Sequence, residues 1–172
     1  RNNEILYEKE SVEGLNHSRL LSVFIDEIFK GSVIDLRSVD GIAVSMGPGS
    51  YTGLRIGVSI AKGLCYALDK PLIAVGTLDA MGLYVAENVD QYLPGIKNPD
   101  NVLFCPMIDA RRMEVYTALF NGSGEKLEAV SAKIIKKDFL SDYLEKYSVL
   151  FFGNGAAKCK PVLSHPNAIF SG

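Results

Sequence analysis

The feature that most constrains the fold is a glycine-rich turn that joins an apolar segment to a long helical segment. The stretch SMGPGSYTGLRIGVSIAKG covers residues 45–63. It overlaps the end of a short apolar run at residues 40–46, which is typical of a strand covered on both faces. A helix is predicted from about Thr52 to Leu68, because Pro71 disfavours helix in the residue before it. Many phosphate-binding loops join a strand to a helix in this way.

The spacing of this turn fits neither of two common nucleotide-binding motifs. A dinucleotide loop needs G-x-G-x-x-G, and here one residue too many separates Gly49 from Gly53. A Walker A loop needs a lysine where Leu54 stands. A tight turn capped by Ser50 or Thr52 is therefore the favoured interpretation, with weak anion binding at the helix N-terminus as the alternative. The residues of this candidate vestigial phosphate turn are Gly47, Gly49, Ser50 and Thr52.

Short apolar strands alternate with helices through the first half of the chain, which indicates an α/β unit with parallel strands. Residues 4–10 are predicted to form an edge strand, and Ser18 is a candidate cap for a helix that ends at Lys30. Residues 72–76 are predicted to form another buried strand, and Thr77 to cap the next helix.

The second half of the chain has a different pattern. An antiparallel meander is predicted from residue 102 to 137, followed by a helix from Asp138 or Ser141 and then a buried strand. The chain is predicted to be helical from the GNGAAK stretch to Ser164. We therefore expect an N-terminal α/β lobe over residues 1–87, an inter-lobe loop over residues 88–101 and a C-terminal α/β lobe over residues 102–172.

Both long helices of the first lobe carry more apolar surface than one sheet requires. In the helix ending at Lys30, an apolar face formed by Leu21, Phe24 and Ile28 is widened by Leu20. In the helix of residues 52–68, small residues recur at four-residue spacing, and each helical glycine costs about 1 kcal/mol relative to alanine. Small residues let another backbone approach closely, either the preceding helix or a second protein. These small residues are Gly53, Gly57 and Ala61, and a second apolar stripe contains Ile56, Ile60 and Leu64.

The sequence offers no recognisable catalytic or metal-binding cluster. His17 has Leu21 four residues on, and His165 lies beside a proline, so neither has a partner at ligand spacing. The stretch DARRMEV (residues 109–115) is most simply a solvated hairpin tip, or alternatively a recognition loop, since arginine pairs well with phosphate. A second candidate vestigial phosphate turn contains Gly153, Asn154 and Gly155.

Composition limits the class of protein. Hydrophobic residues make up 48% and charged residues 22% of the 172 residues, as in ordinary soluble globular chains. The net charge of −2 gives no general basic field for nucleic acid. Three widely spaced cysteines indicate free thiols in a reducing compartment, so we expect a cytoplasmic protein with no membrane span. We also expect material to be missing from both ends, because the chain starts without methionine and stops within a strand-like segment.

Residues 45–82, from SMGPGSYTG to LDAMG, closely resemble the bacterial TsaB (YeaZ) family. The segments HSRLLSVFIDEIF, MIDARRMEVYTALF and FFGNGAAK resemble that family in the same order. The resemblance implies the α/β, actin-like and Hsp70-like ATPase (ASKHA) fold with two lobes, here lacking the first strand or strands and the C-terminal end.

The resemblance also implies a function. Family members take part in tRNA threonylcarbamoyladenosine modification, as non-catalytic scaffolds that dimerise with and activate the paralogue TsaD. Here Leu21 replaces the second histidine of the TsaD metal pair, so we expect no metal and no catalytic activity of its own. The partner interface carried over from the family comprises Leu20, Leu21, Phe24, Ile28, Gly53, Arg55, Ile56, Gly57, Ile60, Ala61 and Leu64.

Further partners follow from the same resemblance. We expect a homodimer when the protein is alone, contact with the TsaE ATPase and with tRNA only through the complex, and no tightly bound cofactor, with ATP or ADP only within the complex. Two other functions stay open: a nucleotide-dependent transferase or hydrolase that uses the two glycine turns, and a glycoprotease-like peptidase.

Overall fold

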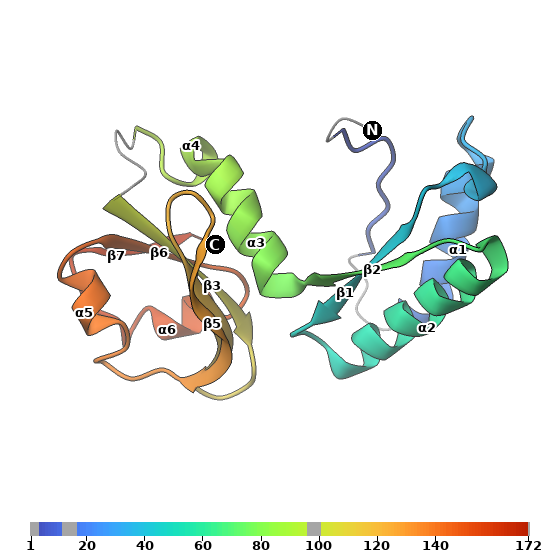
Figure 1. Cartoon of the computed structure of the whole chain (residues 1–172). Coiled ribbons are helices and arrows are strands. Elements are labelled where there is room, and N and C mark those ends of the chain that lie inside the picture. The colour runs from blue at the N-terminus through green and yellow to red at the C-terminus, as the bar shows by residue number, and fades with distance from the viewer. Residues whose placement is uncertain (1–3, 12–16, 96–100, 172) are drawn as a thin grey trace. The chain divides into compact units, whose positions relative to one another are not determined.

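The structure is a computed structural model, and it describes residues 4–11, 17–95 and 101–171. The chain divides into two compact units, Arg1–Val75 (unit 1) and Gly76–Gly172 (unit 2) (Figure 1). Each unit combines helices with a β-sheet, so the α/β class predicted from the sequence is confirmed.

The division between the units lies before helix α3 (Thr77–Glu87), whereas the sequence places the lobe boundary after this helix. The helix belongs to unit 2 because it packs against two strands of that unit's sheet. Gly82 permits the close approach, since a Cβ atom at this position would lie 2.6 Å from the ring of Phe120.

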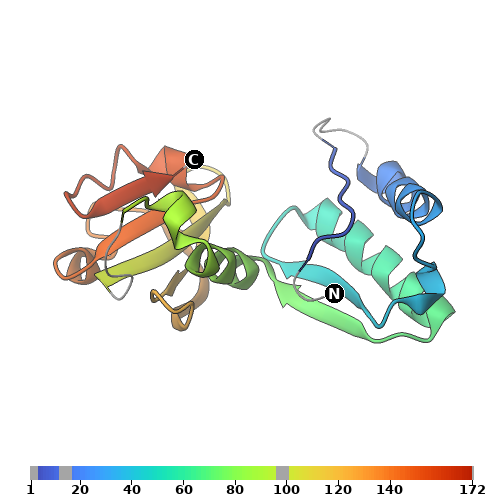
Figure 2. The same cartoon turned by 90° about the horizontal axis from the view of Figure 1, so that it is seen from above.

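Unit 1 is a strand–helix–strand arrangement preceded by another helix. Its elements are α1 (His17–Lys30), the 3-10 helix η1 (Leu36–Ser38), β1 (Ile42–Gly47), α2 (Tyr51–Leu68) and β2 (Leu72–Gly76). The two strands pair with each other, α2 packs against β1, and α1 packs against α2 (Figure 2). The Ser50 hydroxyl accepts the Gly53 N–H at 3.3 Å, so Ser50 rather than Thr52 caps α2.

Two predictions for unit 1 differ from the structure. Residues 4–10, expected as an edge strand, form no strand, because a strand needs a hydrogen-bonded neighbour and this segment instead contacts α1. The strands expected to be covered on both faces are largely exposed, and the Ile73 side chain in β2 is 51% exposed. Among the described residues of unit 1, only Ala61 is buried.

Unit 2 is built on a five-stranded sheet of order β5-β4-β3-β6-β7. Its strands are β3 (Val102–Asp109), β4 (Glu114–Phe120), β5 (Lys126–Ile134), β6 (Ser148–Phe152) and β7 (Ala168–Ser171). The first three strands pair antiparallel, which confirms the predicted meander, and β6 and β7 join them in parallel.

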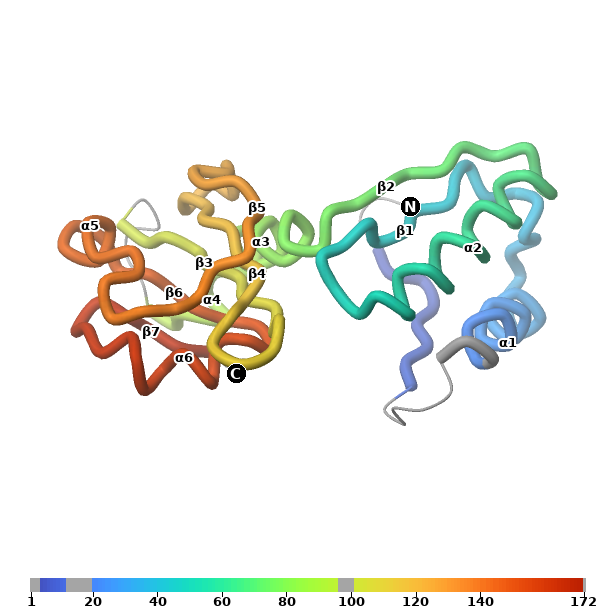
Figure 3. The backbone as a smooth tube through the Cα atoms, turned by 90° about the horizontal axis from the view of Figure 1, so that it is seen from below, coloured from blue at the N-terminus to red at the C-terminus, as the bar shows by residue number. Residues whose placement is uncertain are grey.

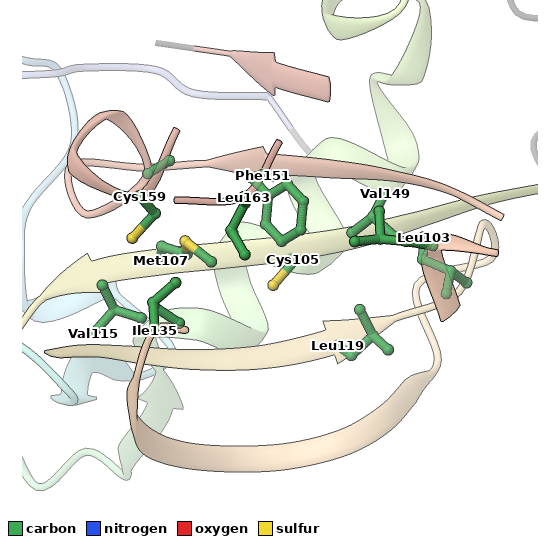
Figure 4. Close-up of a cluster of buried hydrophobic side chains, with 12 residues drawn as sticks. Leu103, Cys105, Met107, Val115, Leu119, Ile135, Val149, Phe151, Cys159 and Leu163 are labelled. Carbon is green, nitrogen blue, oxygen red and sulfur yellow. The ribbon is translucent and has the colours of Figure 1, made fainter. Parts of the chain in front are cut away.

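The sheet of unit 2 buries apolar side chains on both faces. One face packs beneath α3, where Phe104 and Phe120 belong to the same buried cluster as Leu78 of that helix. The other face forms a cluster around Phe151, Cys105 and neighbouring aliphatic side chains, as Figure 4 shows. Alternating residues of the same strands supply the two clusters, as the period-2 geometry of a strand requires.

Unit 2 has three further helices, which are α4 (Val89–Tyr92), α5 (Ser141–Leu144) and α6 (Ala156–Cys159). Helices α5 and α6 are shorter than predicted, and α4 was not predicted. The helix expected to run to Ser164 ends at Cys159, where the chain turns so that Cys159 and Leu163 enter the core. Helix α4 lies within the segment expected to be a loop, of which residues 96–100 lie outside the described residues. None of the helices in the described ranges is long and apolar enough to cross a membrane.

Candidate partner interface

An apolar groove of about 380 Å³ lies between α1 and α2 within unit 1. Figure 2 shows the two helices, blue and blue-green, on the same side of the β1–β2 sheet. Leucine and phenylalanine side chains of α1 form one wall, and α2 and its N-cap form the other. The lining residues are Ser11, Leu20, Leu21, Phe24, Ser50, Gly53 and Ile56.

The α1 wall consists of apolar side chains that the chain only partly covers. From Leu20 to Lys30, every side chain of α1 is half-buried or exposed. The helix begins at His17, before the predicted cap Ser18, and the side chains of these two residues lie outside the described residues. Apolar surface of this kind marks interaction sites when it is contiguous, as it is along the groove.

The segment before α1 also contributes to the groove, a contribution that was not predicted from the sequence. Lys9 forms an ion pair with Glu27 of α1, and its ammonium group lies 5.7 Å from the centre of the Phe24 ring. Ser11 follows in the segment and lines the groove. No periodic pattern marks these residues, because an ion pair between positions far apart in sequence leaves no local signal.

The small-residue face of α2 is used inside unit 1. A Cβ atom at Gly57 would lie 3.5 Å from Cγ2 of Val44 in β1, and Ala61 is 5% exposed. Gly57 therefore faces the chain's own sheet, and Ala61 is buried on the same face of the helix, so the predicted role of these two residues at a partner interface stays a prediction. Small residues allow close packing against a strand of the same chain as well as against a partner helix. The sequence alone therefore could not tell which of the two lies on this face of α2.

The other predicted interface residues fall into three groups. Leu20, Leu21, Phe24, Gly53 and Ile56 line the groove together. Ile28, Ile60 and Leu64 are half-buried and lie outside its lining. Arg55 is exposed, and its guanidinium carbon lies 4.5 Å from the centre of the Tyr51 ring, so it stacks on its own helix.

The first glycine turn is filled by the chain itself. Gly47 has φ +99°, a conformation that favours glycine, and a Cβ atom there would lie 3.1 Å from the Leu54 side chain. The backbone N–H of Leu54 donates to the Ser50 carbonyl at 2.8 Å. Leu54 thus occupies the position of a Walker lysine and also packs into the turn.

The second glycine turn is also occupied by its own sheet. The Gly155 N–H donates to the Met107 carbonyl at 3.0 Å, and the Asp109 N–H donates to Oδ1 of Asn154 at 2.9 Å. A Cβ atom at Gly153 would lie 2.6 Å from the same carbonyl. The glycines therefore serve close packing against β3, and the Gly155 N–H, a donor that a phosphate could use, is already hydrogen-bonded.

An ion pair joins the second turn to the β3–β4 hairpin. The Lys158 ammonium donates to the Asp109 carboxylate and to the Glu114 carbonyl, the latter at 2.7 Å. The hydrogen bond from Lys158, and then that from the backbone N–H of Arg111, lower the pKa of Asp109 below its ordinary value. The carboxylate is therefore held ionised as a structural group at the base of the hairpin.

The remaining chemistry-bearing side chains serve the core or turns. Burial raises the pKa of the Cys105 thiol to about 12, partly offset by its contact with the Thr117 hydroxyl. Cys159 is also buried and donates to the Gly155 carbonyl. Within the described residues, no group of three or more His, Cys, Asp or Glu side chains could hold a metal ion.

Comparisons with known proteins identify the family. A family model described as TsaD: tRNA N6-adenosine threonylcarbamoyltransferase matches residues 11–170. The tRNA threonylcarbamoyladenosine biosynthesis protein TsaB of Bacillus subtilis is 33% identical over 151 residues, which cover 86% of this chain and 61% of that protein. The protein of the same name from Haemophilus influenzae is 38% identical over 100 residues, 58% of this chain and 38% of its own length.

The chain belongs to the TsaB (YeaZ) family. A protein named tRNA N6-adenosine threonylcarbamoyltransferase from Clostridium kluyveri matches less of the chain, with 33% identity over 81 residues, 47% of this chain and 23% of that protein. The resemblance predicted from the sequence motifs is therefore confirmed. The chain spans about three-fifths of the length of the Bacillus subtilis TsaB, at 61%.

The solved structures of the TsaB (YeaZ) family confirm the fold. YeaZ from Pseudomonas aeruginosa superposes with a TM-score of 0.67 over 92% of this chain and 71% of that protein, at 23% identity. The α/β units therefore have the actin-like (ASKHA) fold predicted for the family.

Proposed function

We propose that this protein is a non-catalytic scaffold that binds and activates TsaD in tRNA threonylcarbamoyladenosine biosynthesis, with the α1–α2 groove as the docking surface. The observation that carries the proposal is the groove itself, with its apolar lining and half-covered α1 face. The names of the relatives support the pathway, since three of them are called tRNA threonylcarbamoyladenosine biosynthesis proteins.

A helical partner fits this groove best. Its two walls are helices, and apolar side chains separated by the small residue Gly53 leave room for a ridge of another helix. TsaD is a paralogue with the same fold, so it would present helices in the corresponding position. In the absence of TsaD, a second copy of this protein would use the same surface, which makes the homodimer a competitor of the heterodimer.

We expect this chain alone to bind no nucleotide. Both glycine turns are filled by the chain, with Leu54 in the first and β3 against the second. The association with the TsaE ATPase, and ATP or ADP binding within the complex, stay predictions from the family resemblance.

The test is complex formation between the full-length protein and its cognate TsaD, measured by calorimetry and by size-exclusion chromatography with light scattering. The variant Ile56→Glu places a charge in the groove, and we expect at least a hundredfold weaker binding and loss of tRNA modification by the reconstituted system. The variant Tyr66→Glu adds the same charge to the same helix at a side chain that is 93% exposed and outside the groove lining. We expect it to bind as the wild type does.

Two results would contradict the proposal. One is that the wild-type protein forms no complex with TsaD. The other is that Ile56→Glu and Tyr66→Glu behave alike while both proteins retain wild-type circular dichroism.

A further inference from the structure

The hairpin between β3 and β4 carries two consecutive arginines in a backbone conformation that L residues rarely adopt. Arg111 has φ +72° and Arg112 has φ +50°. Asparagine and glycine are the usual residues at such positions, because a longer side chain crowds the backbone there. A turn that only reversed the chain would be more stable with those residues, so the two arginines are candidates for a further role.

The two arginines form no ion pair in the part of the chain that the structure describes, although the charge of Arg111 also acts on the nearby Asp109 carboxylate. That carboxylate is already bound by Lys158. The loop between β3 and β4 projects from the end of the sheet (Figure 3). Both side chains are exposed there and free to bind an anion.

Further positive charge lies beside the hairpin. The Ile135 N–H donates to the Met113 carbonyl at 2.9 Å, which brings the exposed residues Lys136 and Lys137 next to the turn. The opposing carboxylates in these two segments are Glu114 and Asp138, since Asp109 is neutralised by Lys158. The hairpin is thus locally basic in a chain whose net charge is −2.

An apolar wall and an aromatic ring accompany the charges. A groove of about 540 Å³ is lined by residues 110–114 and by Ile134, whose side chain is 65% exposed. In the strand register Glu114 lies opposite Ile134 and Tyr116 opposite Ala132, so Tyr116 and Ile134 share one face of the sheet. The Tyr116 side chain is 36% exposed.

We propose that the β3–β4 hairpin is an RNA-binding surface, in which Arg111 and Arg112 contact backbone phosphates and Tyr116 offers a stacking surface for a base. Arginine binds phosphate oxygens bidentately, and an exposed aromatic ring beside a cationic groove is the arrangement that binds unpaired nucleotides. An acidic protein segment could form ion pairs with the two arginines but has no base to stack on the Tyr116 ring. That the RNA is a tRNA rests on the proposed function.

The test is the affinity of the full-length protein, alone and with TsaD, for a fluorescein-labelled unmodified tRNA transcript, measured by anisotropy between about 50 and about 200 mM KCl. For the variant Arg111→Gln/Arg112→Gln we expect an affinity about tenfold lower near 100 mM salt. The slope of log K against log salt should be smaller by about 1.4, or about 0.7 for each lost contact with a phosphate of an unpaired strand. Tyr116→Leu should weaken binding about fivefold or more with an unchanged slope.

Two further variants keep the result independent of folding. Arg111→Asn/Arg112→Gly places favoured residues in the turn, so its thermal midpoint should equal or exceed that of the wild type while RNA binding falls. Lys62→Gln/Lys146→Gln removes the same charge from exposed positions outside the hairpin and should bind RNA as the wild type does.

Three results would overturn the inference. The first is that the wild-type protein binds no tRNA in either form. The second is that the hairpin and control variants bind tRNA equally. The third is that the arginine variants lose TsaD binding instead, which would make the hairpin a protein interface. TsaD binding is measured in the same samples by light scattering, whereas RNA binding is measured by anisotropy. A loss of the scaffold role can therefore be distinguished from a loss of RNA binding.

Discussion

The two units of this protein differ in how completely they cover their own apolar residues. In unit 2, a five-stranded sheet has helices on both faces, and side chains such as Phe104 and Phe151 are fully buried. In unit 1, a two-stranded sheet is packed against α2, and Ala61, 5% exposed, is the only buried residue among those described in this unit. Apolar residues make up nearly the same share of both units in the sequence, yet nearly all of those described in unit 1 are half-buried or exposed.

The difference shows where binding energy remains available. A side chain that is already buried contributes to stability and has nothing left to offer a partner. A half-covered side chain such as Phe24 contributes less to stability and can be buried further by association. The α1–α2 groove is therefore where unit 1 can gain the burial that unit 2 already has.

The largest expected effect tests this difference directly. Phe151→Ala should lower the free energy of unfolding by about 3–5 kcal/mol, because it leaves a cavity in the packed core of unit 2. Phe24→Ala should cost about 1 kcal/mol, because its ring is only half-buried. Urea unfolding followed by far-ultraviolet circular dichroism measures both, since the chain has no tryptophan for fluorescence. Equal losses would show that the groove is as well packed as the core.

Substitutions at two helical glycines, one in each unit, test the same difference in packing with smaller expected changes in stability. Gly82→Ala in α3 should destabilise the protein by about 1–3 kcal/mol, because its Cβ atom would overlap the Phe120 ring. Gly63→Ala in α2 should stabilise it by about 1 kcal/mol, because no atom lies within 4 Å of the added methyl group. Thermal unfolding of the two single variants measures whether each substitution raises or lowers the stability of the protein. A destabilising Gly63→Ala would mean that this face of α2 is covered in the intact protein.

The smallest expected effect concerns the ion pair of Asp109 with Lys158. Because the pKa of Asp109 is lowered in the folded state, its contribution to stability is present above the unfolded pKa of about 3.9 and is lost as the pH falls through the folded pKa. In Lys158→Met, the pKa should rise toward that unfolded value, with a residual lowering from the Arg111 N–H. Carboxyl chemical shifts measured by NMR between about pH 2 and about pH 6 would show this change. This range extends about two pH units below and above the unfolded pKa of an aspartate.

The matched control for this titration is Lys146→Met. Lys146 is exposed and lies just before β6, whose first residue pairs with the first residue of β3, so it is at the end of the sheet away from Asp109. We expect the pKa of Asp109 to be unchanged in this variant. A shift of equal size would indicate a general charge effect instead of a specific ion pair.

Much of the fold followed from local sequence signals. The Ser50 cap, the helix ending at Leu68 and the β3–β4–β5 meander are set by side-chain and turn preferences that act over a few residues. The predicted edge strand at residues 4–10 was wrong, because a strand needs a hydrogen-bonded neighbour. The predicted long last helix was also wrong, because the chain leaves the helix after Cys159 and turns so that Leu163 packs into the core. In both cases contacts distant in sequence overrode the local preference.

By itself, the sequence determined the α/β class, the family motifs and the presence of apolar stripes on α1 and α2. Only the tertiary structure decided what covers each stripe. Gly57 packs against β1, Gly153 and Gly155 pack against β3, and Phe24 and Ile56 line a groove. Periodicity reports which residues share a face of a helix. It carries no information about the neighbour on that face, because that neighbour comes from elsewhere in the chain or from another molecule.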